Sequence, residues 1–300
     1  MANPYDDSQG WTRFDYGASD GLQLSARKYG FSNRQAMPVI CLAGLTRNSA
    51  DFHELAMHLA WRAALPRPVL ALDYRGRGMS ARDKHWQNYN IMNEAEDVIA
   101  AANAAGIGQA AFIGTSRGAL IIMVLAAMRP TLLGAAVMND AGPQIDGRGL
   151  VRIRNYVEKG RDFDNWSSAV AAMKMIGQGH FPNWDDAMWA VQTRRIYSET
   201  GGRIIRRYDP ALMKTLTAIN LDNRLPTLWP QFKGLARIPL LVVRGANSDL
   251  LSQATLAKMQ SLHPAMQSVS VPHQGHAPDL GTELLPRRIA AFLGDAAITH

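Results

Sequence analysis

The chain has 300 residues, of which 47% are hydrophobic and 19% are charged, and this balance excludes a mainly disordered chain. The net charge is +7, but the basic residues are scattered and form no nucleic-acid motif, so no nucleic-acid partner is expected. The longest apolar stretch, residues 119–128, is about half as long as a membrane span requires.

Two further features indicate the compartment. The amino terminus carries two acidic residues and no apolar core, so it does not have the pattern of a secretory signal. The single cysteine, Cys41, cannot form an internal disulfide, which fits a reducing compartment. It lies in an apolar run, so we expect a buried, unreactive thiol. A cytoplasmic location is therefore expected.

The first half of the chain has the alternating pattern of a parallel sheet. Residues 11–16 and 22–29 predict a hairpin around residues 19–21. Short apolar runs then predict strands, and helical patterns lie between them. The strands are expected at residues 39–43, 69–73, 110–114 and 134–139, and the helices at 49–63, 93–105 and 117–128. This order is the βαβ signature.

The pattern changes from about residue 142 to residue 235. This segment has no convincing buried strand, is rich in Trp and Met, and shows helical periodicity at 166–176 and 184–196. Sheet-like order then returns, with strands expected at 238–243 and 267–271 and helices at 253–262 and 283–293. A sheet that is interrupted and then resumes predicts one core domain (residues 1–142 and 236–300) with an inserted helical cap (143–235).

The most informative motif is Gly114-Thr115-Ser116-Arg117-Gly118, which follows a β-like run and opens a helical one. This is the context of a nucleophile elbow, a sharp turn that exposes a serine hydroxyl above the sheet. Side chains two residues to either side would collide with the neighbouring strand and helix, so glycine is needed there. The alternative role for Ser116 is a simple helix N-cap; we favour the nucleophile.

A serine nucleophile needs a base, and in this kind of turn the base follows it along the chain. Of the later histidines, His180 falls in the cap segment, whereas His273 and His276 follow the last predicted strand. Loops at the carboxyl ends of sheet strands carry such groups. We predict His276 as the base and keep His273 as the alternative.

The base in turn needs an orienting carboxylate. Asp249 lies in the loop after the predicted strand at 238–243, 27 residues before His276. Asp140 follows the preceding strand and is the competing candidate, with a turn-forming role as its simpler explanation. We predict Asp249 as the acid.

Attack on a carbonyl group places negative charge on its oxygen, which fixed N–H groups must stabilise. One donor is expected to be the amide of Arg117, directly after the nucleophile. The other is expected from the loop after the first central strand, where the sequence is Ala43-Gly44-Leu45, and we predict the Leu45 amide.

Four motifs together resemble the α/β-hydrolase superfamily, in its order and at its spacing over almost the whole chain. They are Asp73-Tyr74-Arg75-Gly76-Arg77-Gly78-Met79-Ser80, residues 114–118, residues 244–249 and Gly275-His276. The resemblance implies an eight-stranded, mostly parallel sheet flanked by helices, with a helical cap after strand six. It also implies hydrolysis of an acyl bond, most often a carboxylic ester, without a cofactor or metal.

Some residues depart from the superfamily's common pattern. Many relatives have His-Gly where this chain has Ala43-Gly44, a change that spares the backbone donors but affects how substrate is placed. Ser116 stands where haloalkane dehalogenases and epoxide hydrolases carry aspartate, which argues against their chemistry. For the Arg117 side chain, a surface salt bridge is favoured over contact with an anionic substrate.

The expected activity is cleavage of a small to medium, partly hydrophobic ester through an acyl-enzyme. Lactones and carbon–carbon bonds are the alternatives on the same triad, because relatives cleave both. A slow-turnover ligand-binding protein is the alternative outside catalysis. The sequence does not define the oligomeric state.

Overall fold

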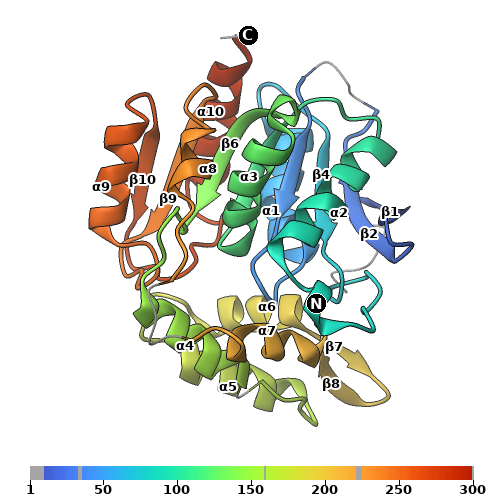
Figure 1. Cartoon of the computed structure of the whole chain (residues 1–300). Coiled ribbons are helices and arrows are strands. Elements are labelled where there is room, and N and C mark those ends of the chain that lie inside the picture. The colour runs from blue at the N-terminus through green and yellow to red at the C-terminus, as the bar shows by residue number, and fades with distance from the viewer. Residues whose placement is uncertain (1–9, 33–35, 159, 221–224, 299–300) are drawn as a thin grey trace.

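The computed structural model describes residues 10–32, 36–158, 160–220 and 225–298. Eight strands form one sheet in the order β1-β2-β4-β3-β5-β6-β9-β10 (Figure 1). Strand β2 is antiparallel to both its neighbours, and all other pairs are parallel. The strands are β1 (Thr12–Gly17), β2 (Gln23–Tyr29), β3 (Val39–Leu42), β4 (Val69–Asp73), β5 (Ala110–Thr115), β6 (Leu133–Asn139), β9 (Leu240–Gly245) and β10 (Gln267–Val271).

Helices cover both faces of the sheet, which explains why its central strands are apolar throughout. Helices α1 and α10 lie on one face, and α2, α3 and α8 lie on the other (Figure 1). Helix α9 connects β9 to β10. Their bounds are α1 (His53–Met57), α2 (Ile91–Ala104), α3 (Arg117–Met128), α8 (Trp229–Lys233), α9 (Gln253–Leu262) and α10 (Leu285–Ile298).

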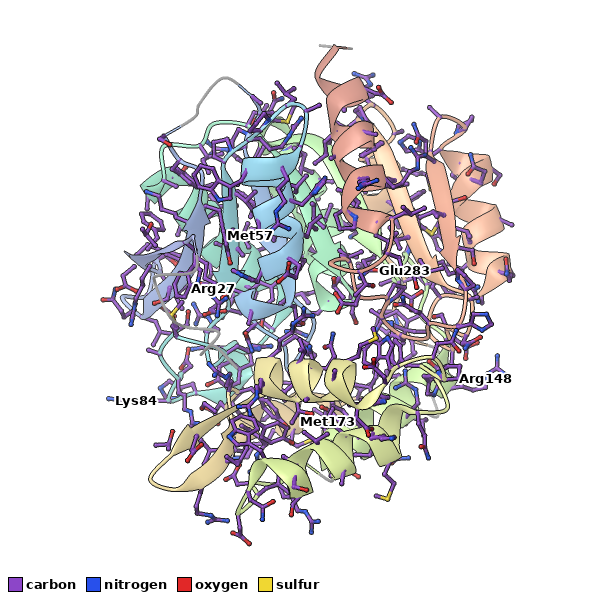
Figure 2. All side chains as sticks on the ribbon, turned by 180° about the vertical axis from the view of Figure 1, so that it is seen from behind. Arg27, Met57, Lys84, Arg148, Met173 and Glu283 are labelled. Atoms are coloured by element: carbon purple, nitrogen blue, oxygen red, sulfur yellow. The ribbon has the colours of Figure 1, made fainter. Side chains whose placement is uncertain are left out.

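The remaining helices and a small hairpin lie across the carboxyl edge of the sheet, and together they are called the cap segment below (Figure 1). They pack around a hydrophobic cluster of their own. In Figure 2, Met173 lies inside this segment and Arg148 projects from it. The elements are α4 (Gly147–Glu158), α5 (Trp166–Gly177), α6 (Asp186–Ile196), β7 (Tyr197–Thr200), β8 (Arg203–Arg206) and α7 (Met213–Thr217).

The expected fold is confirmed, with an eight-stranded, mostly parallel sheet flanked by helices. The division into core and cap at residues 142/143 and 235/236 stays a prediction. Helix α8 falls inside the range expected for the cap, yet it packs against α3, and its Phe232 is part of the main core.

Two local features differ from the expected pattern. The helix expected at 49–63 divides into a 3₁₀ turn (Ser49–Phe52), α1 and a wider π turn (His58–Arg62). The hairpin β7–β8 was not expected. Its turn is Gly201-Gly202, and both glycines have positive φ angles, +58° and +75°. Such a pair is the usual signal of a two-residue hairpin, and it stands plainly in the sequence.

Two single features bear on expectations from the sequence. Cys41 is fully buried in β3, and burial raises the pKa of its thiol. Within the described ranges, no helix is both long enough and apolar enough to cross a membrane.

Candidate active site

Ser116 occupies a strained turn between β5 and α3, with φ 53° and ψ −110°. A Cβ on Gly114 would lie 2.5 Å from the carbonyl carbon of Gly118. A Cβ on Gly118 would overlap the carbonyl oxygen of Leu42 in β3. Strain of this kind persists only where the surrounding structure enforces it. The turn therefore has the geometry of a nucleophile elbow, with both glycines required by close approach.

His276 faces this serine from the loop after β10. Its Nε2 atom lies 2.9 Å from Ser116 Oγ, and its side chain is 8% exposed. The alternative, His273, is exposed and has no such contact in the described structure. His180 of the cap segment lies against the same loop, because a Cβ on Gly275 would be 2.7 Å from His180 Cβ.

The carboxylate beside His276 belongs to Asp140, and the expectation that Asp249 fills this place is wrong. Asp140 Oδ2 lies 2.8 Å from His276 Nδ1, and the Asp140 side chain is fully buried. Asp249 instead forms a bidentate ion pair with Arg152 of α4, at 2.6 and 2.9 Å. Burial alone would raise the pKa of Asp249, but Arg152 outweighs it and holds that pKa below its ordinary value.

The loop that contains Asp249 still contributes to the site, but through other groups. The amide of Gly245 donates to Asp140 Oδ1 at 2.9 Å, and Ser248 Oγ donates to Asp140 Oδ2 at 2.7 Å. Asp140 itself has a positive φ of 56°, and this turns its side chain directly after β6. These two donors hold the carboxylate in place against His276 and fix its orientation.

The predicted oxyanion donors lie beside the serine. A Cβ on Gly44 would be 3.8 Å from Ser116 Cβ, so the loop that carries Leu45 passes next to Ser116. Leu45 and Ser116 line the same cavity. The Arg117 amide is in the first turn of α3, where N–H groups have no partner within the helix. The assignment of both amides as oxyanion donors remains a proposal.

The Arg117 side chain points away from the cavity and makes a salt bridge, as expected, but with a buried partner. Its Nε atom lies 2.5 Å from Glu94 Oε2, and the Glu94 side chain is fully buried in α2. The sequence pattern of α2 gave no sign that an acidic residue would be buried there.

A cavity of about 210 Å³ lies between Ser116 and the cap segment. One wall is apolar and comes from cap residues, including Met173, Phe181, Trp184 and Trp189. Trp184 stacks on Phe181, with ring centroids 4.1 Å apart. The Tyr156 hydroxyl reaches into this wall and donates to the Met173 sulfur at 3.7 Å. The cavity is therefore suited to a ligand with a hydrophobic part.

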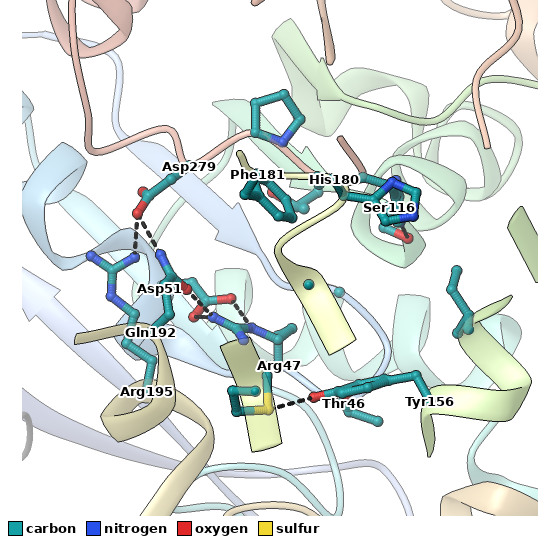
Figure 3. A pocket seen from close by; sticks show the side chains of 18 of the residues that line it. Thr46, Arg47, Asp51, Ser116, Tyr156, His180, Phe181, Gln192, Arg195 and Asp279 are labelled. Atoms are coloured by element: carbon teal, nitrogen blue, oxygen red, sulfur yellow. Dashed lines mark hydrogen bonds and ion pairs between the residues drawn. The ribbon is translucent and has the colours of Figure 1, made fainter. Parts of the chain in front are cut away.

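Another part of the lining is a connected group of charged and polar side chains (Figure 3). Arg47 is paired with Asp51 by two contacts of 2.6 Å and donates to Gln192 at 2.9 Å. Asp279 then accepts from Gln192 and from Arg195. The sequence analysis did not identify this group, because its members come from three distant segments. Across the described residues, no cluster of three or more His, Cys, Asp or Glu side chains could hold a metal ion.

The fold and this constellation define an α/β hydrolase. The profile of the alpha/beta hydrolase fold family matches residues 37–158. The structure is similar to that of an alpha/beta hydrolase from Novosphingobium aromaticivorans, with a TM-score of 0.87, 38% identity and coverage of 95% of this chain and 98% of the other. The chain therefore belongs to the α/β-hydrolase family, and it is a hydrolase.

Two relatives have named activities. A 3-hydroxybutyrate-oligomer hydrolase from Cupriavidus necator is 29% identical over 248 residues, which are 80% of this chain and 82% of the relative. A 2-(acetamidomethylene)succinate hydrolase from Mesorhizobium japonicum is also 29% identical, over 252 residues, with 83% and 85% of the two chains covered.

Replacing Gly118 by alanine should destabilise the protein by about 3 kcal/mol or prevent folding, because the new methyl group meets the backbone of β3. Gly108→Ala is the matched control, since a Cβ there meets nothing within 4 Å, and it should change stability by less than about 1 kcal/mol. Urea denaturation followed by circular dichroism measures both. Equal stability of the two variants would contradict the close approach.

Asp140→Asn should slow reaction of Ser116 with a fluorophosphonate probe by about 10³- to 10⁴-fold, because the amide cannot stabilise charged His276. Asp249→Asn removes a carboxylate that touches neither His276 nor Ser116, so its rate should fall by less than about fivefold. Labelling rates of the two purified variants decide between the aspartates. A larger loss with Asp249→Asn would restore the acid predicted from the sequence.

Proposed function

We propose that this chain is a serine hydrolase that cleaves a small to medium, partly hydrophobic carboxylic ester through an acyl-enzyme. The observation that carries the proposal is the unbroken line of contacts from Ser116 Oγ through His276 to Asp140, at 2.9 and 2.8 Å. Ser116 and His276 also line a cavity whose lining is partly apolar.

In the proposed reaction, His276 takes the proton of Ser116 as the serine oxygen attacks the substrate carbonyl carbon. The amides of Leu45 and Arg117 stabilise the oxyanion. Asp140 orients His276 and stabilises its charged form. His276 then gives the proton to the leaving alcohol, and an acyl-enzyme remains. Water, activated by the same histidine, releases the acid and restores Ser116.

An ester is favoured over other acyl compounds by two observations. The cavity has both apolar and polar lining residues, which suits a substrate whose hydrophobic and polar parts are joined by a carbonyl group. One relative is named as a hydrolase of 3-hydroxybutyrate oligomers. When the hydroxyl group of one hydroxy acid is joined to the carboxyl group of the next, the bond between the units is an ester. The Arg47 and Arg195 side chains already have carboxylate partners, so a strongly anionic substrate is not required.

A second candidate is hydrolysis of a bond other than an ester, such as a carbon–carbon bond, on the same residues. The relative named for 2-(acetamidomethylene)succinate favours it, because that compound contains no ester group. Lactones are ring esters and fall under the first proposal.

Release of p-nitrophenol from acyl esters of increasing chain length tests the proposal. The native chain should turn over the short and medium esters, and the chain-length limit should reflect the cavity of about 210 Å³. Ser116→Ala should keep its fold by circular dichroism and lose about 10⁴-fold or more of the turnover, since no other described group occupies the nucleophile position.

Two results would count against the proposal. Turnover that persists in Ser116→Ala would remove the serine from the mechanism. Absence of turnover on every ester, combined with labelling of Ser116 by a fluorophosphonate, would replace the ester proposal with the second candidate, which is then tested with 2-(acetamidomethylene)succinate.

A further inference from the structure

A buried network of charged side chains connects Leu45 and Arg117, the residues that carry the two proposed oxyanion donors. Arg77, in the loop after β4, donates from Nε to the carbonyl oxygen of Leu45 at 2.8 Å. Its side chain has no solvent exposure, and its Nη1 also donates to the carbonyl of Arg75 at 2.7 Å. The guanidinium is therefore fixed on one side by its own loop and contacts the oxyanion loop on the other.

Glu94 joins this arginine to the elbow. Its Oε1 atom lies 2.9 Å from Arg77 Nη1, and its Oε2 atom lies 2.5 Å from Arg117 Nε. Arg117 Nη2 also donates to the carbonyl of Tyr89 at 3.0 Å. Burial would raise the pKa of Glu94, but the two guanidinium groups outweigh it and hold that pKa below its ordinary value. Glu94 thus stays ionised between two arginines.

The two arginines connect Glu94 to the two residues whose amides are the proposed oxyanion donors. Arg117 carries one proposed donor on its own backbone, so anchoring its side chain restrains the residue whose N–H faces the oxyanion. Arg77 holds the carbonyl of Leu45, the residue whose N–H is the other proposed donor. A donor that is displaced by about 1 Å loses much of its value to the transition state.

We propose that Glu94, together with Arg77, positions the oxyanion hole by fixing Leu45 and Arg117 relative to each other. The inference rests on the proposed function, since it concerns the same two amides. Glu94 touches neither substrate nor reacting atoms and acts only through the two arginines. It is a positioning residue, not a catalytic one.

The chain offers a matched control three residues further along α2. Asp97 is also buried, with 2% side-chain exposure, and it also binds an arginine of the loop after β4, here Arg75. Its two contacts to Arg75 are 2.7 Å long. The Arg75 side chain contacts neither Leu45 nor Arg117 among the described residues. The two ion pairs share helix, loop, burial and charge. Arg75 also binds Asp20 and Asp83, and only the Glu94 pair is linked to the proposed oxyanion donors.

The experiment compares Glu94→Gln with Asp97→Asn on the best p-nitrophenyl ester. Both variants should lose thermal stability. Only Glu94→Gln should lower kcat, by about 10- to 100-fold with KM within about twofold, because the lost interaction matters mainly in the transition state. Its affinity for a trifluoromethyl ketone, which forms a tetrahedral adduct with the serine, should fall by a similar factor. Asp97→Asn should keep kcat within about threefold.

Two further measurements keep the test decisive. If Glu94→Gln does not fold, Arg117→Lys is compared with Arg75→Lys, since each keeps a positive charge and loses the fixed guanidinium. If the native chain turns over no ester, the labelling rate of Ser116 by a fluorophosphonate replaces kcat, because that reaction also places charge on an oxygen at the same site.

Each outcome has a definite meaning. A selective loss in kcat or labelling rate for the Glu94 or Arg117 variant supports the positioning role. Equal losses in the paired variants, or a loss confined to KM, would overturn it and leave Glu94 as a structural ion. Ester turnover by the native chain with no selective loss would therefore reject this inference and preserve the proposed function. A native serine that neither turns over esters nor reacts with the probe would reject both.

Discussion

The buried carboxylate of Asp140 joins three loops at the carboxyl edge of the sheet. It follows β6, accepts from Gly245 at the end of β9 and from Ser248 in the loop after it, and contacts His276 after β10. A buried carboxylate without partners would cost several kcal/mol, so these contacts are required for the fold as well as for the site. Asp140 holds Nδ1 of His276 at 2.8 Å, and the other ring nitrogen of His276 lies 2.9 Å from Ser116 Oγ. The site is thus assembled by the ends of parallel strands that the core has already placed side by side.

The sequence pointed to Ser116 and His276, which the structure brings together, because each follows from a local pattern. Gly114 and Gly118 mark the elbow around Ser116, and His273 and His276 lie in the loop directly after the last strand. The acid could not be settled in this way. Asp140 and Asp249 both follow strands, β6 and β9, that are neighbours in the sheet. The choice between them depends on backbone direction, and the positive φ of Asp140 is not visible in the sequence. In the loop after β9, the residue that contacts Asp140 is Ser248, the neighbour of Asp249.

The layers of the core were predicted more completely than the cap segment. Buried parallel strands are short apolar runs, and the helices between them have clear periodicity, so α3 and α9 were placed with the bounds that the structure shows. Contacts between the cap segment and the core include charged pairs from distant parts of the chain. Arg152 meets Asp249, and Arg195 meets Asp279. Nothing in the local sequence indicates such a pair, because each partner alone has the pattern of an ordinary surface residue.

The loop after β4 contacts both the cap segment and the loop that carries Leu45. Its backbone pairs with the cap segment, where the Gly78 amide donates to the carbonyl of Arg207 and the Asp209 amide donates to the carbonyl of Gly76, each at 2.8 Å. Arg77 lies between these two bonds, and its side chain holds Leu45 on the opposite side. Short backbone bonds on both sides leave Arg77 little freedom to move without disturbing the pairing. The attachment of the cap segment and the geometry of the loop beside Ser116 are therefore not independent, since both depend on the same few residues.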